Sequence, residues 1–375
     1  MKPKSSRRDF LKGKSASRAA SGEISRSRGQ GPAADSRLIH VSRKAMACEF
    51  EITFNAGQYP RDAELALETL DLVDILEDRM SVFRHESEIS RINRTAADEP
   101  VEVEPGLFGL LELALQLHDE TDGAFDVTST PLWEVWGFDR RAGAVPDEAE
   151  LAEARSRVGS HLVRLDPDRH TVRFLKEGVQ LNLGSLGKGY ALDRCSQKLM
   201  EAGVDDFLIH GGGSSVTAHG SRATAQGKLP AEPHRGWTVG VVHPLRGTRR
   251  LAEVRLRDRA LATSGSRAQS FVYKGQRFGH ILDPRTGWPA EGLLSATVVA
   301  PSAALADGLA TAFYVLGPQR SLEYCRSRPE IAAVLVCPVR HSGGLELKTV
   351  GFADDEPIST IEPSAAGRPA LRRLP

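Results

Sequence analysis

The hydrophobic positions near the start of the chain first follow a two-residue period and then a helical one. Apolar residues alternate with polar ones over residues 38–54, which predicts strand structure. Over residues 61–80 the apolar side chains recur every three or four positions, which predicts a helix with one buried face. The same spacing returns at Leu107 and predicts a second helix, which ends near Gly123, where a glycine can cap it.

The second half of the chain favours short strands and two further helices. Residues 178–183 are expected to form a buried strand that runs into a glycine-rich turn, and a helix follows from about Lys188 to near Gly203. A strongly amphipathic pattern predicts another helix over residues 302–316. The runs predicted to be strands are 207–210, 237–242, 251–256, 269–273, 293–299 and 332–336, with a hairpin turn at Lys274-Gly275. Because helices and strands mix without strict βαβ alternation, we expect an α+β (mixed α/β) fold with mainly antiparallel sheets.

Composition narrows the class of protein. The 375 residues are 40% hydrophobic, enough for one large core or two modest ones. Lys plus Arg and Asp plus Glu each number 49, so the formal net charge is zero and no global field favours nucleic acid. The four cysteines lack the spacing of a zinc site or a disulfide framework. Since no apolar run could cross a bilayer, we expect a soluble, globular body without a transmembrane segment.

Both ends of the chain differ from the middle. Residues 1–37 are rich in Ser, Arg, Gly and Ala and are expected to be disordered, and residues 354–375 are expected to be loose. Residues 38–353 then form one domain. Ser6-Arg7-Arg8-Asp9-Phe10-Leu11-Lys12 resembles a twin-arginine export signal, but polar and charged residues follow where such a signal needs an apolar stretch. We expect a cytoplasmic location, with a periplasmic or membrane-associated one as the alternative.

Three segments could carry chemistry. The loop from Leu181 to Tyr190 places three glycines and Lys188 before a helix, which suits phosphate binding but also an ordinary tight turn. His280 could move a proton, with Asp283 orienting it or merely capping a proline turn. Asp307 and Thr311 share one face of a predicted helix. They could bind Mg²⁺ through oxygen, or they could be a solvent-facing acid and a hydroxyl bonded to the helix backbone.

Further small polar and aromatic segments have two interpretations each. Thr263-Ser264-Gly265 and the His210–Ser214 run follow predicted strands and could line a ligand site or form simple turns. The aromatic residues around Phe125 and over residues 133–136 lie beside an acid, and such residues more often fill a core than stack on a cofactor. Each segment alone is a weak indication of function.

The order of these segments and their residues together resemble the ApbE family of FAD:protein FMN transferases. The resemblance covers residues from about 40 to about 350 and is specific, because several motifs agree in register. The motifs are Met46-Ala47-Cys48, Met80-Ser81-Val82-Phe83, Ser87-Glu88-Ile89-Ser90-Arg91-Ile92-Asn93, Gly123-Ala124-Phe125-Asp126-Val127-Thr128, Leu183-Gly184-Ser185-Leu186-Gly187-Lys188-Gly189, Leu261-Ala262-Thr263-Ser264-Gly265, His280-Ile281-Leu282-Asp283-Pro284-Arg285-Thr286-Gly287 and Ala306-Asp307-Gly308-Leu309-Ala310-Thr311.

The resemblance implies a single unit whose cleft binds FAD with Mg²⁺, splits the pyrophosphate, releases AMP and leaves FMN on a threonine or serine of a target flavoprotein. It implies metal ligation by the Gly187 carbonyl, Asp307 and Thr311. It gives His280 the role of taking the acceptor proton, and Lys188 that of neutralising the pyrophosphate with Mg²⁺. The FAD contacts that it implies are Met46, Phe83, Ala124, Phe125, Asp126, Gly184, Lys188, Tyr190 and Ile281.

This sequence departs from the family pattern at three places. Met46-Ala47-Cys48 stands for the usual Met-Gly-Thr, Asn182 replaces an aspartate, and Ser266-Arg267-Ala268 replaces an acidic and then an aromatic residue. These changes could alter flavin binding or the choice of acceptor. Two rival functions use the same residues: an FAD pyrophosphatase, in which water replaces the protein hydroxyl, and a non-catalytic FAD carrier.

Overall fold

The computed structural model describes residues 38–375 with the exception of 233, 248, 266–268, 340–343, 353–358, 361–369 and 374–375. Residues 1–37, with the twin-arginine-like segment, lie outside the described residues. In the described part of the chain, no helix is both long and apolar enough to cross a membrane.

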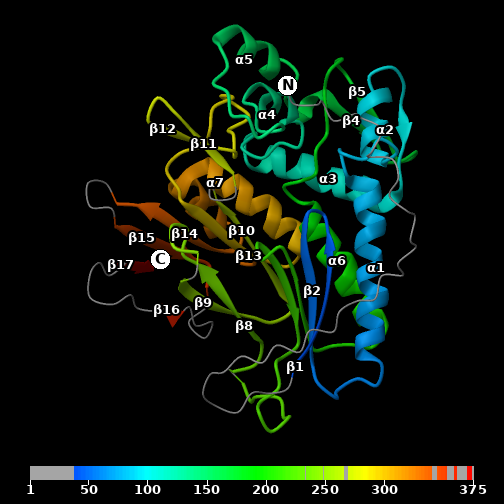
Figure 1. The fold of residues 1–375 in the computed structure, drawn as a ribbon, viewed down its shortest axis with the longest axis vertical. Coiled ribbons are helices and arrows are strands. Elements are labelled where there is room, and N and C mark those ends of the chain that lie inside the picture. Colours follow the sequence, from blue (N-terminus) through cyan, green and yellow to red (C-terminus); the bar gives the residue numbers. More distant parts are fainter. Residues whose placement is uncertain are drawn as a thin grey trace, which may run out of the picture.

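A nine-stranded sheet forms the centre of the molecule (Figure 1). Its order is β1-β2-β6-β7-β10-β13-β14-β15-β17, and only the last pair, β15 and β17, is parallel. This pairing confirms the expected α+β class. The strands are β1 (Leu38–Ala45), β2 (Cys48–Asn55), β6 (Phe207–Gly211), β7 (Ser215–His219), β10 (Arg259–Gly265), β13 (Ser295–Ala300), β14 (Ala332–Pro338), β15 (Leu345–Val350) and β17 (Ala370–Arg373).

Three smaller sheets surround the large one. The first has the order β3-β5-β4, the second β16-β9-β8, and the third is the hairpin β11-β12. The hairpin turns at Lys274-Gly275, as predicted, with φ of 48° and 81° at these residues. The strands are β3 (Val101–Glu102), β4 (Val163–Asp166), β5 (Thr171–Phe174), β8 (Trp237–Val242), β9 (Arg250–Leu256), β11 (Ser270–Tyr273), β12 (Gln276–Gly279) and β16 (Ser359–Thr360).

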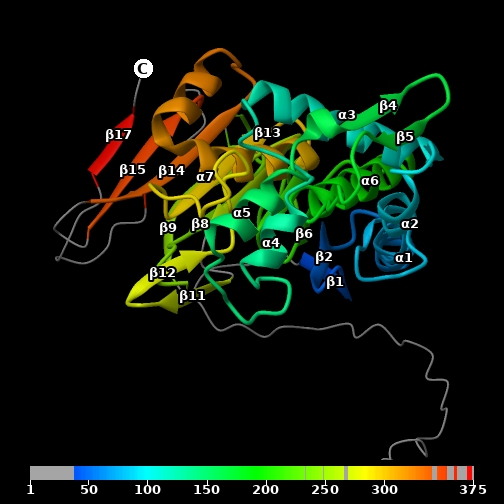
Figure 2. The same cartoon turned by 90° about the horizontal axis from the view of Figure 1, so that it is seen from above.

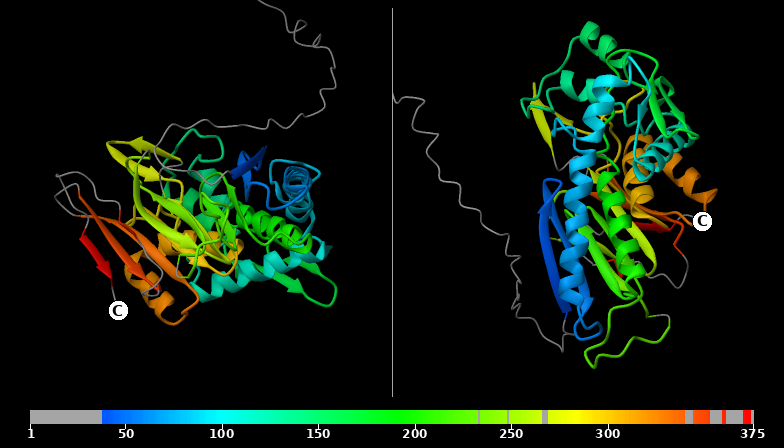
Figure 3. Two further views of the ribbon diagram at one scale, coloured as in Figure 1. Left: turned by 90° about the horizontal axis from the view of Figure 1, so that it is seen from below. Right: turned by 90° about the vertical axis from the view of Figure 1, so that its right-hand side faces the viewer.

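Helices α1 (Asp62–Met80), α6 (Gly187–Glu201) and α7 (Ala303–Arg326) cover one face of the large sheet (Figure 2). The apolar stripe predicted for α1 is buried there against side chains such as Phe50 and Ile52. Figure 3 shows α1 beside the β1–β2 hairpin. The other helices are α2 (Glu88–Thr95), α3 (Pro105–Glu120), α4 (Thr130–Val135) and α5 (Glu148–Arg155), with a 3-10 turn η2 (Ser160–Leu162).

Both faces of the central strands are buried in separate cores. On β14, Ala333 and Leu335 pack in the core under the helices, whereas Val334 and Val336 pack in a second core beneath β8 and β9. A strand covered on both faces needs apolar residues at every position, which explains the continuous apolar run of β14. A third, smaller core joins α4, α5, β11 and β12 at one end of the molecule (Figure 1).

The structure corrects three expectations. Residues 178–183 are not a strand: Asn93 binds both the N–H and the C=O of Leu181 at 2.7 and 2.9 Å, so a side chain replaces the strand partner. The helix predicted to end at Leu316 continues to Arg326 after a break at Gly317, whose φ is 76°. Within the tail expected to be loose, β16 and β17 pair with β9 and β15, because those edges offer unpaired backbone groups. The rest of that tail lies outside the described residues.

The turn between β1 and β2 carries local strain. Met46 and Ala47 both have left-handed φ, 49° and 58°, as a two-residue hairpin turn requires. An acceptor on α1 holds this turn, since Glu77 Oε2 accepts the Met46 N–H at 2.8 Å. A non-glycine residue in this region is strained, because its Cβ crowds the backbone.

We expect Ala47→Gly to raise the free energy of unfolding by about 0.5–1 kcal/mol, since glycine removes the Cβ strain but adds freedom to the unfolded chain. Urea unfolding measures the change. The exposed Ala152 on helix α5 is the matched control, and Ala152→Gly is expected to lower stability by about 1 kcal/mol. Equal losses at both positions would contradict the assignment of strain to the turn.

Candidate active site

A cavity of about 370 Å³ lies between the helix-covered sheet and the small third core. One side of the cavity consists of the start of α6, the residue before β7, the end of β10, and α7. The other side consists of the loop before α4, α4 itself and the segment after β12. The residues that line it are Ala124, Phe125, Asp126, Val127, Ser129, Thr130, Trp133, Asn182, Gly184, Ser185, Lys188, Ser214, Thr263, Ser264, Gly265, His280, Ile281, Leu282, Pro284, Asp307 and Thr311. Nine of the residues implied by the family resemblance are therefore brought together in one space.

Asp307 lies at the base of this cavity with only 6% of its surface exposed. Its Oδ1 accepts the hydroxyl of Ser215 at 2.6 Å, and its Oδ2 accepts the N–H of Gly189 at 2.7 Å. Burial raises the pKa of Asp307, while the charge of Lys188 and the two hydrogen bonds oppose that rise. The solvent-facing interpretation of this residue is therefore wrong, because the carboxylate is buried and oriented.

Lys188 stands at the second residue of α6, where a cation and a helix N-terminus favour the same anion. The turn of Gly184 and Ser185 precedes it and also lines the cavity. The Asn182 side chain shapes this turn by accepting the Gly184 N–H at 2.9 Å. Asn182 thus serves the loop as a turn former, a function that its amide oxygen performs without the charge of an aspartate.

The donor atoms around Asp307 suit Mg²⁺. Thr311 lies one turn further along α7; its hydroxyl donates to the Asp307 carbonyl at 3.3 Å and lies 3.0 Å from the Ser264 hydroxyl. In the described part of the chain, no three His, Cys, Asp or Glu side chains gather as metal ligands. One carboxylate with neutral oxygens suits Mg²⁺, which commonly keeps waters and binds substrate phosphates. Gly187, the first residue of α6, is buried and does not line the cavity.

His280 faces the cavity from the opposite side. Its Nδ1 lies 3.0 Å from the carbonyl oxygen of Gln269, so that nitrogen carries the hydrogen and Nε2 keeps its lone pair. Burial lowers the pKa of His280, with the Gln269 contact opposing in part. The imidazole is therefore neutral near pH 7. Trp133 adds an edge-on ring contact at 6.2 Å and donates its Nε1–H to the His280 carbonyl at 2.8 Å.

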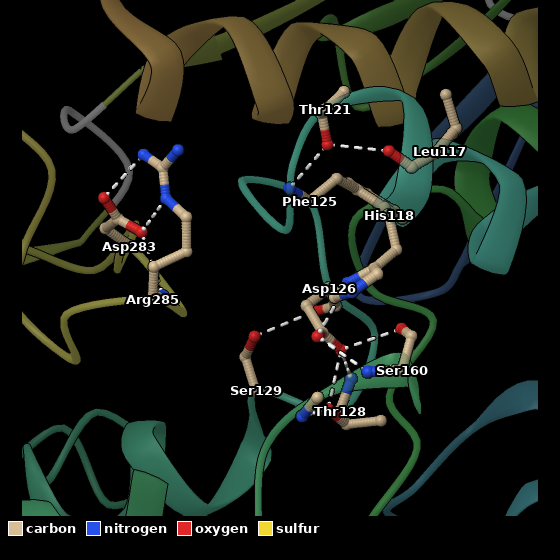
Figure 4. Close-up of polar contacts among 11 residues, drawn as sticks. Leu117, His118, Thr121, Phe125, Asp126, Thr128, Ser129, Ser160, Asp283 and Arg285 are labelled. Atoms are coloured by element: carbon tan, nitrogen blue, oxygen red, sulfur yellow. Dashed lines mark hydrogen bonds and ion pairs between the residues drawn. The ribbon is translucent and has the colours of Figure 1, made fainter. Parts of the chain in front are cut away.

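Asp283 caps a turn and does not orient His280. Its carboxylate binds the Arg285 guanidinium through two contacts of 2.8 Å and accepts the Arg285 N–H at 3.0 Å (Figure 4). Of the two interpretations of Asp283, capping is confirmed, and the carbonyl of Gln269 has the orienting role. Sequence spacing could not reveal this, since Gln269 is eleven residues away on the other side of a hairpin.

The carboxylate of Asp126 organises a wall of the cavity (Figure 4). It accepts the N–H and hydroxyl of Thr128 at 2.8 and 2.6 Å, and the N–H and hydroxyl of Ser160 at 3.0 and 3.1 Å. Nδ1 of His118 lies 3.0 Å from its Oδ2. Only 1% of the Asp126 side chain is exposed, so its carboxylate is used in contacts within the protein. A ligand at this wall would therefore contact the neighbouring backbone and Phe125.

The Asp126–His118 ion pair makes stability depend on pH. Burial alone would raise the pKa of Asp126, but His118 and Thr128 hold it below its usual value, and Asp126 raises the pKa of His118. The lowered carboxyl pKa stabilises the fold above about pH 4, and this contribution is lost as pH falls through the folded value. The raised imidazole pKa stabilises it below about pH 6.5, and this is lost as pH rises through the folded value.

We therefore expect His118→Gln to lower the free energy of unfolding by about 2 kcal/mol between about pH 5 and 6, between the values for exposed and fully buried pairs. The loss should shrink as pH rises through the folded pKa of His118, above which the imidazole is neutral in both states. Urea unfolding at several pH values measures it. A loss that does not change with pH would mean that the imidazole acts by packing alone.

Three residues implied as FAD contacts lie outside the main cavity. Met46 lines a second, open hollow with Cys48 and Glu77, and Phe83 is 86% exposed after α1. The hydroxyl of Tyr190 faces the start of α3, since a Cβ on Gly106 would lie 2.5 Å from it. Burial raises the pKa of the Cys48 thiol in this second hollow, and the charge of Lys188, which lines the main cavity, opposes that rise.

Sequence reasoning missed several functional neighbours. Ser215 and Ser129 gave no signal, since isolated serines are common on strands and loops. Trp133 was visible as part of an aromatic run, but the usual interpretation as core holds only for Trp136, which is fully buried. Ser214 and Thr263–Gly265, which the sequence predicts to be small polar loops after strands, line the cavity, but the loop assignment is wrong for Thr263–Gly265, which are the last residues of β10.

The fold and the cavity together define an α+β enzyme with a buried carboxylate, a lysine and a neutral histidine around one space. The chain belongs to the ApbE family, whose model matches residues 46–335. A relative from Treponema pallidum is 34% identical over 290 residues, 74% of this chain and 79% of the relative. One from Haemophilus influenzae is 29% identical, over 84% of this chain and 90% of the relative. Both are named FAD:protein FMN transferase.

Solved structures agree with this assignment. An ApbE protein from Thermotoga maritima matches with a TM-score of 0.71 and 29% identity, over 82% of this chain and 96% of that one. The flavinyl transferase ApbE of Pseudomonas stutzeri matches with a TM-score of 0.72 and 27% identity, over 84% and 95%. The fold expected from the sequence is thus confirmed by its structural neighbours.

Proposed function

We propose that this protein is an FAD:protein FMN transferase, which moves FMN from FAD to a threonine or serine hydroxyl of a target flavoprotein and releases AMP. The observation that carries the proposal is the pairing of buried Asp307 and Lys188 on one side of a cavity that has His280 on the other. The comparisons support the proposal, because relatives that match most of this chain are named FAD:protein FMN transferase.

The chemistry follows from charge and position. Lys188 holds the diphosphate of FAD at the start of α6, where the helix dipole favours an anion, and the Gly184-Ser185 turn lets the diphosphate approach the backbone closely. Asp307 and Thr311 would hold Mg²⁺ from the cavity lining, and the family resemblance adds the Gly187 carbonyl, which does not itself line the cavity. When bound, the ion would supply charge neutralisation to the diphosphate. The carboxylate of Asp307 is oriented for this purpose by Ser215 and Gly189.

His280 would act as the general base. Its Nε2 takes the proton of the acceptor hydroxyl while the hydroxyl oxygen forms a bond to the FMN phosphorus. The bond between that phosphorus and the bridging oxygen breaks, and AMP leaves with the electron pair. Because Nδ1 is held by the Gln269 carbonyl, the ring presents Nε2 to the cavity without rotating.

The test is incubation of the purified protein with FAD, MgCl₂ and a flavoprotein domain that carries the acceptor threonine. Fluorescence in a denaturing gel detects covalent flavin, and chromatography follows AMP. We expect one AMP for each flavin bound to protein, with both lost in EDTA or when the acceptor threonine is replaced by valine. AMP with free FMN and no labelled protein would establish the pyrophosphatase instead, and stoichiometric FAD binding without AMP would establish the carrier.

A further inference from the structure

Helices α6 and α7 approach so closely at their first turns that no side chain fits between them. A Cβ on Gly189 would lie 2.1 Å from the carbonyl oxygen of Ala303 and 2.6 Å from the nitrogen of Ala304. Both distances are far below a normal contact, and the atoms met are backbone, which cannot rotate away. The absence of a side chain at Gly189 is therefore a requirement of this helix pair.

Asp193 lies one helical turn after Gly189 and so projects from the same face of α6. Its Oδ1 accepts the N–H of Ala303 at 2.7 Å, and its Oδ2 accepts the N–H of Ala304 at 2.8 Å. Burial raises the pKa of Asp193 to about 6, so the carboxylate is charged at neutral pH. A charged acceptor on one helix thus binds the first two N–H groups of the other.

These contacts exceed what capping of α7 needs. The helix already has its own N-cap, since the Ser302 hydroxyl accepts the N–H of Leu305 at 3.3 Å. Asp193 comes from a different helix and takes the two remaining N–H groups of the first turn. Its contacts therefore fix the distance between two helices, which a cap within one helix cannot do.

The atoms of the candidate site lie directly beside this contact. Lys188 precedes Gly189 on α6, and Asp307 follows Ala303 by one turn on α7. The Gly189 N–H itself donates to Asp307 at 2.7 Å, so the same residue forms the close contact and orients the carboxylate. Because Lys188 is on α6 and Asp307 is on α7, a small separation of the two helices would also increase the distance between these two side chains.

We propose that Gly189 and Asp193 are positioning residues: together they form a clamp that sets the spacing between the first turns of α6 and α7, and with it the geometry of Lys188, Asp307 and Thr311. The inference rests on the proposed function only for its kinetic readout. The clamp acts through spacing, so the length of the side chain at position 193 matters as much as its charge.

Three variants test the clamp. Gly189→Ala adds a good helix former but forces the helices apart. Asp193→Asn keeps the length and one acceptor oxygen, whereas Asp193→Glu keeps the charge and adds one methylene. We expect the Mg²⁺ concentration for half-maximal AMP release to rise roughly tenfold or more in Gly189→Ala and Asp193→Glu, and less in Asp193→Asn. If Asp193 only capped α7, stability to urea would fall in the Asp193 variants while the Mg²⁺ response stayed at the wild-type value, which would overturn the proposal.

Controls separate the clamp from folding and from the proposed function. Gly109→Ala on α3, where a Cβ meets no atom within 4 Å, and Asp98→Asn at an exposed site are expected to match the wild type. FAD affinity, measured by quenching of flavin fluorescence with and without Mg²⁺, should fall in the clamp variants even if no acceptor is labelled. A wild type that binds FAD but releases no AMP would defeat the proposed function alone. Variants that lose stability to urea yet keep wild-type FAD affinity and Mg²⁺ response would defeat the clamp.

Discussion

Replacing Asp307 by alanine is expected to reduce AMP release from FAD by about 10³-fold or more. This residue is a buried carboxylate that lines the cavity, and its charge acts on Lys188, which lines the same cavity. Its removal takes away the proposed anionic metal ligand and the negative charge that acts on Lys188. Groups that stabilise charge in a water-poor site carry the largest single effects. AMP release at saturating MgCl₂ measures the change.

The control for Asp307→Ala separates chemistry from folding. Asp307→Asn keeps the shape, and its amide can accept the Gly189 N–H through oxygen and donate its NH₂ to the Ser215 hydroxyl. It should therefore fold like the wild type while its activity stays close to that of the alanine variant. Ser215→Ala removes only one contact to the carboxylate, and we expect a loss of about tenfold. Asp168→Ala, at an exposed site, should change nothing. Activity within tenfold of wild type in Asp307→Asn would mean that the carboxylate does not bear the charge that the reaction needs.

The sequence predicted those parts of the fold that follow from a local period. The sequence predicts helix α1 and the hairpin at Lys274-Gly275, because the residues that define a buried stripe or a two-residue turn lie within a few positions of one another. Residues 178–183 were assigned wrongly, since Asn93 satisfies their backbone from 88 positions away. No local pattern can contain such a tertiary contact.

The candidate site likewise has a part that the sequence predicted and a part that it could not predict. The resemblance gathered Lys188, His280 and Asp307, which the fold brings into one cavity. The partners that orient them were not visible: Ser215 and the Gln269 carbonyl come from strands or turns far along the chain. Sequence motifs name the groups that react, whereas the residues that hold those groups are determined by the packing of elements.

Replacing His280 by alanine is expected to lower the rate of transfer to a protein acceptor by about 10²–10⁴-fold, the usual contribution of a general base. FAD affinity should change little, because the base acts on the acceptor hydroxyl. Transfer at saturating FAD and acceptor, measured from gel fluorescence, gives the rate. His85→Ala, at an exposed histidine, is the matched control and should behave as wild type.

The pH profile of the wild type gives the second readout for His280. Burial lowers the pKa of this histidine from about 6.5, and the imidazole is a base only when neutral. The rate should therefore rise with pH through the folded pKa, which lies below the usual histidine value, and then level off, and His280→Ala should lose this rise. If the variant instead binds FAD poorly while keeping the wild-type pH profile, His280 contacts the flavin nucleotide and another group takes the proton. Because Nδ1 keeps its hydrogen on the Gln269 carbonyl, only Nε2 gains or loses a proton, and the pH–rate profile should show a single rise from this histidine.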